Sequence, residues 1–149
     1  MSERRICSIG HGTRTSEAFF GVLEAWRIRR IVDVRRFPVS RRHPQFSREA
    51  LERECGLRSL EYAWMGDALG GFRDGGYEAH LRTPEFADAL RRLEDLARER
   101  ATAFLCAEKD PARCHRRFIA QELARRGWAV THLLDARSAV PEGAQGELW

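Results

Sequence analysis

One short segment in the last third of the chain carries the side chains best suited to covalent or acid–base chemistry. Cys106 and Glu108 end an apolar run, and Cys114, His115 and Arg116 follow a few residues later. A cysteine near a helix N-terminus and beside basic groups has a lowered pKa, which makes its thiolate available as a nucleophile. Glu108 would act as a general base or orient His115. We therefore predict Cys106, Glu108 and His115 as catalytic residues. The alternative is that Cys106 and His115 are ordinary core side chains.

The same segment bears on anion and metal binding. Arg116 and the free amides at the start of the following helix would hold an anion, and we place Cys114 in the same substrate-binding set. Structural zinc usually takes pairs of ligands two to four residues apart, and Cys106 and Cys114 do not have that spacing. We therefore predict no metal and no cofactor. A redox pair of Cys106 and Cys114 stays open as an alternative.

A Gly-His-Gly turn follows the first apolar run of the chain. It begins like a dinucleotide-binding fingerprint but lacks the third glycine, and no Lys-Ser/Thr phosphate loop occurs in the sequence. The backbone amides of such a turn can form a nest for an oxyanion or phosphate. We predict His11 as a catalytic residue and Gly10 and Gly12 as substrate contacts. The alternative for His11 is a bond to a neighbouring loop.

A carboxylate and two arginines form the third candidate group. Asp33 and Arg35 lie at the end of a compact apolar run, and Ser40 and Arg41 lie just beyond it. The planar donor fork of arginine matches phosphate and carboxylate, so we predict all four as substrate-binding residues. The alternative is an internal pair of Asp33 with Arg35, which would leave Arg41 for the ligand. Tyr77 is predicted as a substrate-binding acid or stacking group, or else as a packing anchor.

Strands and helices are expected to alternate between these segments. Short β-prone runs predict strands at residues 4–9, 31–34, 60–64, 101–107 and 128–134. Helical spacing, caps and stop signals predict helices at residues 15–26, 47–55, 83–97 and 110–126. Residues 65–80 hold five of the twelve glycines and are predicted as a functional loop.

This alternation predicts an α/β fold, a three-layer αβα sandwich around a mostly parallel sheet of about five strands. The 149 residues fit a single domain, predicted over 1–137, with a loosely ordered tail over 138–149. Ligands of open parallel sheets bind beyond the carboxyl ends of the strands. All the candidate groups follow predicted strands, so we expect them to meet at that edge.

The composition narrows the functional class. Lys109 is the only lysine, and eight arginines lie between Arg27 and Arg48 against one acid, Asp33, in a chain of net charge +4. This local excess favours an anionic partner. No apolar run reaches the length of a membrane span, and the chain begins without a signal-peptide core. We therefore predict a cytoplasmic protein without a membrane partner, and we make no prediction of its oligomeric state.

Several of these segments occur together in a known family. They are Ser8–Gly12, Val32–Arg35 with Pro38, Ser40 and Arg41, Leu69–Gly71, Leu105–Glu108 and Cys114–Arg116. Together they resemble the domain-of-unknown-function 488 family, over roughly residues 6–134. The resemblance implies a single compact α/β domain and supports a site at the same sheet edge. It brings no reaction with it.

The residues predict an enzyme, a hydrolase or a transferase, acting on an anionic substrate. The substrate class is a nucleotide, a nucleic acid or another phosphorylated compound, and whether Cys106 or Glu108 is the reactive group stays open. One alternative is a noncatalytic nucleic-acid-binding module, in which the basic segment tracks phosphates while Phe37 and Phe46 stack on bases. Another alternative is a metal- or thiol-dependent sensor. The predicted partner is thus an anionic small molecule or a nucleic acid.

Overall fold

A single six-stranded sheet forms the centre of the protein. The structure is a computed structural model, and it describes residues 4–71, 75–110 and 115–143. The strands are β1 (Arg5–Gly10), β2 (Arg30–Asp33), β3 (Glu61–Trp64), β4 (Thr102–Cys106), β5 (Ala129–Leu133) and β6 (Ala139–Pro141). Their order in the sheet is β3-β2-β4-β1-β5-β6. The first five strands run parallel, and β6 pairs antiparallel with β5.

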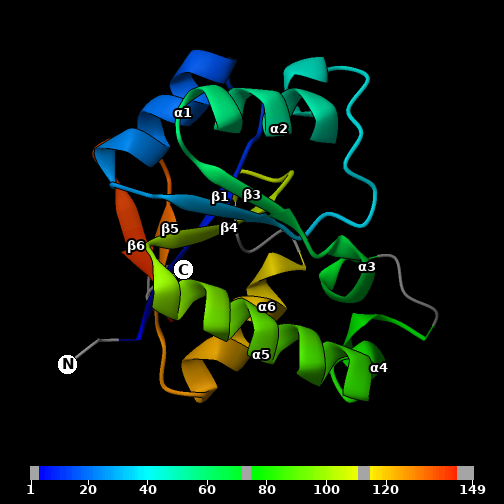
Figure 1. Ribbon diagram of the computed structural model, residues 1–149. Coiled ribbons are helices and arrows are strands. Elements are labelled where there is room, and N and C mark those ends of the chain that lie inside the picture. The colour runs from blue at the N-terminus through cyan, green and yellow to red at the C-terminus, as the bar shows by residue number, and fades with distance from the viewer. Residues whose placement is uncertain (1–3, 72–74, 111–114, 144–149) are drawn as a thin grey trace.

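Helices cover both faces of the sheet, as Figure 1 shows. They are α1 (Ser16–Ala25), α2 (Arg48–Leu57), α3 (Gly66–Leu69), α4 (Tyr77–His80), α5 (Pro84–Glu99) and α6 (Arg116–Arg125), with a 3₁₀ turn, η1 (Pro44–Phe46), before α2. α1 and α2 lie on one face, and α5 and α6 lie on the other. Each face has its own apolar core, one built around α1 and α2 and the other around α5 and α6. The predicted α/β sandwich in one domain is confirmed.

Local sequence explains these elements. Every residue of β2 and β4 is buried, as expected for parallel strands covered on both faces. The Thr15 hydroxyl caps α1 by accepting from the Ala18 amide at 3.1 Å. Thr83 caps α5 in the same way at 3.2 Å from the Phe86 amide, and Pro84 occupies its first turn. These caps fix where the helices on the two faces begin.

The structure differs from the sequence prediction in three places. A sixth strand, β6, lies in the stretch assigned to the tail, so the prediction of about five strands was one short. The predicted loop over 65–80 contains two short helices, α3 and α4. The last helix begins at Arg116, with His115 as its N-cap, and residues 111–114 of the predicted helix lie outside the described residues.

The strand register sets the position of the candidate site. Gly10 at the end of β1 pairs with Cys106 at the end of β4, and Asp33 at the end of β2 pairs with Leu105. Three strands therefore end at one level on the same edge of the sheet, which we call the carboxyl edge. Among the described residues, no helix is both long enough and apolar enough to cross a membrane.

Candidate active site at the carboxyl edge of the sheet

A cavity of about 470 Å³ opens at the carboxyl edge. The residues that line it are His11, Arg35, Arg36, Phe37, Val39, Ser40, Gly71, Cys106, Ala107, Glu108 and His115. They come from the ends of β1, β2 and β4, from the loop after α3 and from the start of α6. The structure therefore brings the four predicted catalytic residues to one cavity.

Cys106 and His115 face each other inside this cavity. Cys106 Sγ lies 3.8 Å from His115 Nδ1, and the other ring nitrogen, Nε2, lies 3.0 Å from the Val34 carbonyl oxygen. A carbonyl oxygen only accepts, so Nε2 carries the proton and Nδ1 of the neutral ring presents its lone pair to the sulfur. This is the orientation that a histidine needs to take a proton from a thiol. Cys106 is disulfide-bonded in the structure, so the dyad operates in the reduced protein.

Two neighbours fix the His115 ring. A Cβ atom added at Gly71 would lie 3.3 Å from His115 Nδ1, so the glycine leaves room for the imidazole. The Tyr77 ring packs against His115 with 5.4 Å between centroids, and its hydroxyl donates to the Leu69 carbonyl at 2.7 Å. Tyr77 therefore acts as the packing anchor of the predicted alternative. Its role as a substrate-binding acid or stacking group stays a prediction.

Asp33 and Arg35 form the internal pair that the sequence left open. Arg35 Nε and Nη2 donate to the two carboxylate oxygens of Asp33 at 2.9 and 2.7 Å, and Tyr62 donates to the same carboxylate at 2.5 Å. The Trp64 indole donates to the Arg35 carbonyl at 2.7 Å. Both members of the pair are buried. Arg35 nevertheless lines the cavity, so it contributes a fixed guanidinium to the cavity wall.

His11 is a neutral side chain at the edge of the cavity. Its ring stacks on Phe46 at 4.5 Å, and its Nδ1 lies 2.8 Å from the Gly12 carbonyl, so Nδ1–H donates there. Burial lowers the pKa of His11 from 6.5 to about 4. The stacking also removes Phe46, which is fully buried, from the aromatic residues available to a ligand.

The Gly-His-Gly turn continues the pairing of β1 with β4. The His11 amide donates to the Cys106 carbonyl at 3.0 Å, and the Gly12 amide donates to the Ala107 carbonyl at 2.8 Å. These two amides are therefore not an anion nest. A Cβ atom at Gly10 would lie 1.6 Å from the Glu108 carbonyl oxygen, so this glycine permits the close approach of the two chains. Gly10 thus serves the packing of the two chains, and substrate contact at Gly10 and Gly12 stays a prediction.

Of the remaining candidates, Glu108 and Ser40 line the cavity. Glu108 is exposed on its rim. The Ser40 hydroxyl accepts from the His43 amide at 3.0 Å, so it closes a turn as well as lining the cavity. Arg41 is exposed on the same loop. Cys114 lies outside the described residues.

Comparison with protein-family models identifies the family. The model described as "Domain of unknown function DUF488" matches residues 15–76 and 74–123, which is more than half of the chain. The chain belongs to the DUF488 family. The segments at Val32–Arg35, Leu69–Gly71 and Leu105–Glu108 lie within the matched residues, and Ser8–Gly12 lies before them. Searches of curated proteins and of solved structures returned no significant match.

In this DUF488 protein, Arg116 lies behind the cavity and not in it. Its side chain is fully buried, and its guanidinium donates to the Glu108 carbonyl at 2.7 Å and to Ser8 Oγ at 2.8 Å. Burial lowers the pKa of Arg116 to about 10. The predicted direct contact of Arg116 with the substrate is replaced by support of the loop after β4.

The Arg116 side chain is the first member of a buried chain of hydrogen bonds that sequence reasoning missed. Ser8 Oγ lies 2.5 Å from His132 Nδ1, and His132 Nε2 lies 2.7 Å from Glu142 Oε1. A neutral His132 satisfies every link, since Nε2–H donates to Glu142 and the Ser8 hydroxyl donates to Nδ1. Burial lowers the pKa of His132, in agreement with a neutral ring. The sequence did contain a signal for this chain of hydrogen bonds, because Ser8 and His132 are polar residues inside mainly apolar strands.

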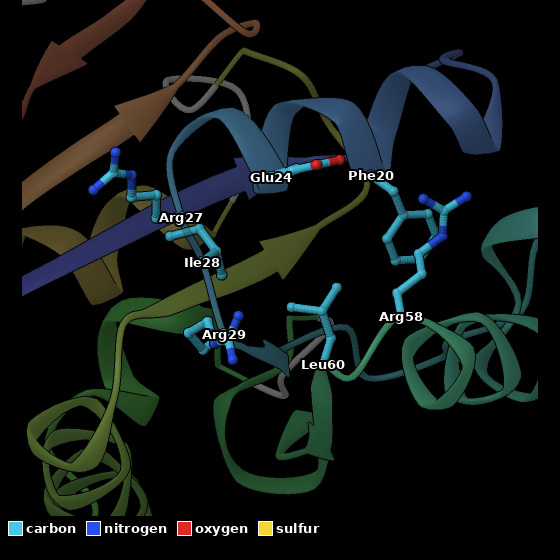
Figure 2. A pocket seen from close by; sticks show the side chains of 7 residues that line it. All are labelled: Phe20, Glu24, Arg27, Ile28, Arg29, Arg58 and Leu60. Atoms are coloured by element: carbon cyan, nitrogen blue, oxygen red, sulfur yellow. The ribbon is translucent and has the colours of Figure 1, made fainter.

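Elsewhere on this DUF488 fold, a second cavity of about 510 Å³ lies at the opposite edge of the sheet, before the start of β2 and β3. Its lining consists of Phe20, Glu24, Arg27, Ile28, Arg29, Arg58 and Leu60. Figure 2 shows these side chains, with the Arg58 guanidinium beside the Phe20 ring. We call this the amino-edge cavity. Neither cysteine nor histidine lines it.

Proposed function

We propose that the reduced protein is an enzyme in which Cys106 acts as a nucleophile on an anionic substrate, as a hydrolase or a transferase. One observation carries the proposal, namely the dyad of Cys106 with a His115 whose tautomer is set by the Val34 carbonyl. A nucleophile within reach of a base, with a third group that orients the base, is the arrangement required for covalent catalysis. A purely structural cysteine needs no such partner.

The dyad supplies a complete proton path for such a reaction. His115 Nδ1 takes the proton from the Cys106 thiol, and the thiolate forms a bond to the electrophilic atom of the substrate. The bond to the leaving group breaks, and the leaving group takes the proton back from Nδ1. Water or a second acceptor then attacks the sulfur-bound intermediate and gives its proton to Nδ1, which releases the thiolate. We assign Glu108, which lines the cavity at its rim, to assist either proton transfer.

The charge of the cavity wall supports an anionic substrate. Arg36 lines the cavity, and so does Arg35, whose charge is balanced by its buried bidentate pairing with Asp33. The buried guanidinium of Arg116 adds positive potential behind the loop after β4. Cations held in fixed positions stabilise developing negative charge better than mobile surface cations do.

Thiol reactivity tests the proposal, with two internal controls. In the reduced protein we expect iodoacetamide to alkylate Cys106 selectively near neutral pH, measured by peptide mass spectrometry. Burial raises the pKa of Cys7 to about 11 and that of Cys55 to about 12, so these thiols should react far more slowly. His115→Gln should move the midpoint of Cys106 alkylation toward the ordinary thiol pKa of about 8.5.

Turnover tests the second half of the proposal. We expect the reduced protein to cleave or transfer a group from at least one of a set of phosphate monoesters, phosphodiesters and nucleotides, and Cys106→Ser to abolish that activity without unfolding the protein. Alkylation of Cys106 no faster than that of Cys7, together with no change in His115→Gln, would overturn the nucleophile assignment.

The disulfide state of Cys106 favours a second candidate, a thiol-dependent sensor. This candidate predicts that Cys106 cycles reversibly between reduced and oxidised forms and that no substrate is turned over. Mass spectrometry under graded oxidant, run beside the turnover assay, separates the two functions.

A further inference from the structure

The loop after β2 presents exposed apolar side chains at the mouth of the carboxyl-edge cavity. Phe37 is 63% exposed and Val39 is 72% exposed, and both line the cavity. Among the described residues only one other large apolar side chain, Leu57, is exposed in this way, at the end of α2. Apolar side chains grouped at the rim of a cavity are a common feature of ligand-binding sites.

The stem of this loop is held firmly while Phe37 and Val39 stay exposed. The Pro38 carbonyl accepts from the Arg48 amide at 2.8 Å, and the Ser40 amide donates to Ser47 Oγ at 3.2 Å. On the other side, a Cβ atom at Gly70 would lie 2.5 Å from Arg36 Cβ, so α3 packs directly against the stem. A ligand would therefore meet a preformed surface, which lowers the entropy cost of binding.

The same loop is strongly cationic. The Arg36 guanidinium lies 5.5 Å from the centre of the Phe37 ring, which places a positive charge beside the aromatic face. Arg41 and Arg42 are exposed, and no described acidic side chain forms an ion pair with either of them. An aromatic platform flanked by arginines is the combination that binds bases by stacking and phosphates by charge.

We infer that the carboxyl-edge cavity takes a phosphate-bearing ligand with a planar heterocycle, and that Phe37 is the residue on which the heterocycle stacks. The inference rests on the proposed function in placing this ligand at the Cys106 cavity, and it names the class of substrate. The ligand is a nucleotide, either free or within a single strand. Arg41 and Arg42 bind the phosphates, and Val39 extends the apolar contact. Phe46, the other aromatic residue of this basic segment, is buried against His11 and takes no part.

Binding measurements on the whole protein test this inference. The probes are a fluorescein-labelled single-stranded DNA 8-mer, a nucleoside 5′-monophosphate and inorganic phosphate. Phe37→Ala should weaken binding of the first two by roughly 10-fold or more, since stacking dominates the contact with each base. Binding of inorganic phosphate should not change. Phe37→Trp should restore binding, and Leu57→Ala is the matched control that removes a similarly exposed apolar side chain that does not line the cavity.

The probes and the salt dependence identify the source of the ligand. Tight binding of the 8-mer with a steep salt dependence, reduced in the double variant Arg41→Ala and Arg42→Ala, indicates a nucleic acid strand. Binding of the monophosphate alone indicates a free nucleotide. Equal binding by Phe37→Ala and the wild type, equal losses in Phe37→Ala and Leu57→Ala, or no binding of either nucleotide probe would overturn the inference. Phe37-dependent binding with an unreactive Cys106 would instead overturn only the proposed catalysis.

Discussion

The two cavities have similar volumes and both contain arginines, yet they differ in what the fold brings to them. The amino-edge cavity has an apolar floor of Phe20, Ile28 and Leu60, with arginines around it (Figure 2). Arg58 there stacks on Phe20 at 4.6 Å and pairs with Glu54 at 3.1 Å within α2. Arg27 and Arg58 also lie at the carboxyl ends of α1 and α2, where the negative end of each helix dipole attracts a cation. The arginines of this cavity thus have a structural explanation.

The carboxyl-edge cavity is lined by groups from three strand ends that are far apart in the sequence. Cys106 at the end of β4 faces His115 across the cavity, and His11 lies directly after β1. Arginines alone therefore do not distinguish the two cavities. The cavity of the proposed active site differs in that cysteine and histidine side chains from separate strand ends also line it.

The largest effect is expected where two strand ends approach most closely. Gly10→Ala would place a Cβ atom 1.6 Å from the Glu108 carbonyl oxygen, which forces the ends of β1 and β4 apart. We expect the free energy of unfolding to fall by roughly 4 kcal/mol or more, measured by urea titration. Gly21→Ala is the matched control, since nothing lies within 4 Å of the added atom in α1. That change should stabilise the protein by about 0.5–1 kcal/mol.

The next largest difference in unfolding free energy is expected between a variant of a buried arginine and a variant of a half-exposed arginine. Arg116→Ala leaves Ser8 Oγ and the Glu108 carbonyl without a buried donor, so we expect a loss of roughly 3 kcal/mol in urea titration. Arg58→Ala at the amino-edge cavity removes a half-exposed cation, and we expect a loss below about 1 kcal/mol. Equal losses in the two variants would contradict the distinction between a buried arginine that supports the carboxyl edge and a half-exposed arginine at the amino-edge cavity.

Much of this contrast was accessible from sequence. Apolar runs and helix signals predicted five of the six strands and the main helices, and the rule for parallel sheets placed Cys106, Glu108, His115 and His11 at one edge. These features follow from local patterns. The three-residue strand β6 has too few residues for a pattern, and it forms only because β5 offers it an edge.

The roles of individual polar side chains were harder to predict. Arg116 looked like an anion ligand because it follows His115 at a helix start, but its partner Ser8 lies on the first strand of the chain. Its burial depends on that distant contact, which no local spacing encodes. The sequence did raise, as an alternative, an internal pair of Asp33 and Arg35 that ties down the loop, and the structure contains this pair.

Acid should destabilise the folded protein because the pKa values of two buried histidines, His11 and His132, are lowered. His11 has a pKa of about 4 in the folded protein and an ordinary value of 6.5 unfolded, so the unfolded chain binds the proton first. The contribution of neutral His11 to the free energy of unfolding is therefore fully present above pH 6.5 and is lost as the pH falls toward 4. At pH 5 the loss from His11 should be roughly 2 kcal/mol.

The variant His11→Asn isolates this contribution. Its drop in unfolding free energy between pH 7 and pH 5 should be smaller than that of the wild type by about this amount, and the interval from pH 7 to pH 8 serves as the control. The lowered pKa of His132 acts in the same direction and should persist in the variant. An unchanged drop in His11→Asn would show that His11 is accessible to protons in the folded protein.

The smallest effect concerns the backbone beside the amino-edge cavity. Arg27 follows α1 with φ of 57°, in the left-handed region that favours glycine, and the Ile28 amide donates to the Leu23 carbonyl at 2.9 Å. α6 ends with the same hydrogen-bond pattern but has Gly127 at this position, with φ of 92°. Arg27→Gly should therefore stabilise the protein by about 0.5–1 kcal/mol in urea titration and leave Cys106 alkylation unchanged.

Gly127→Ala is the converse change, and it should destabilise the protein by about 1 kcal/mol because alanine takes the left-handed conformation at a cost. A loss of stability in Arg27→Gly would show that the Arg27 side chain stabilises the fold by more than its backbone strain costs. A change in Cys106 alkylation would show instead that the two edges of the sheet are coupled. If Arg27→Gly neither loses stability nor alters Cys106 alkylation, then the Arg27 side chain adds to the stability of the fold no more than its charge contributes at the end of a helix.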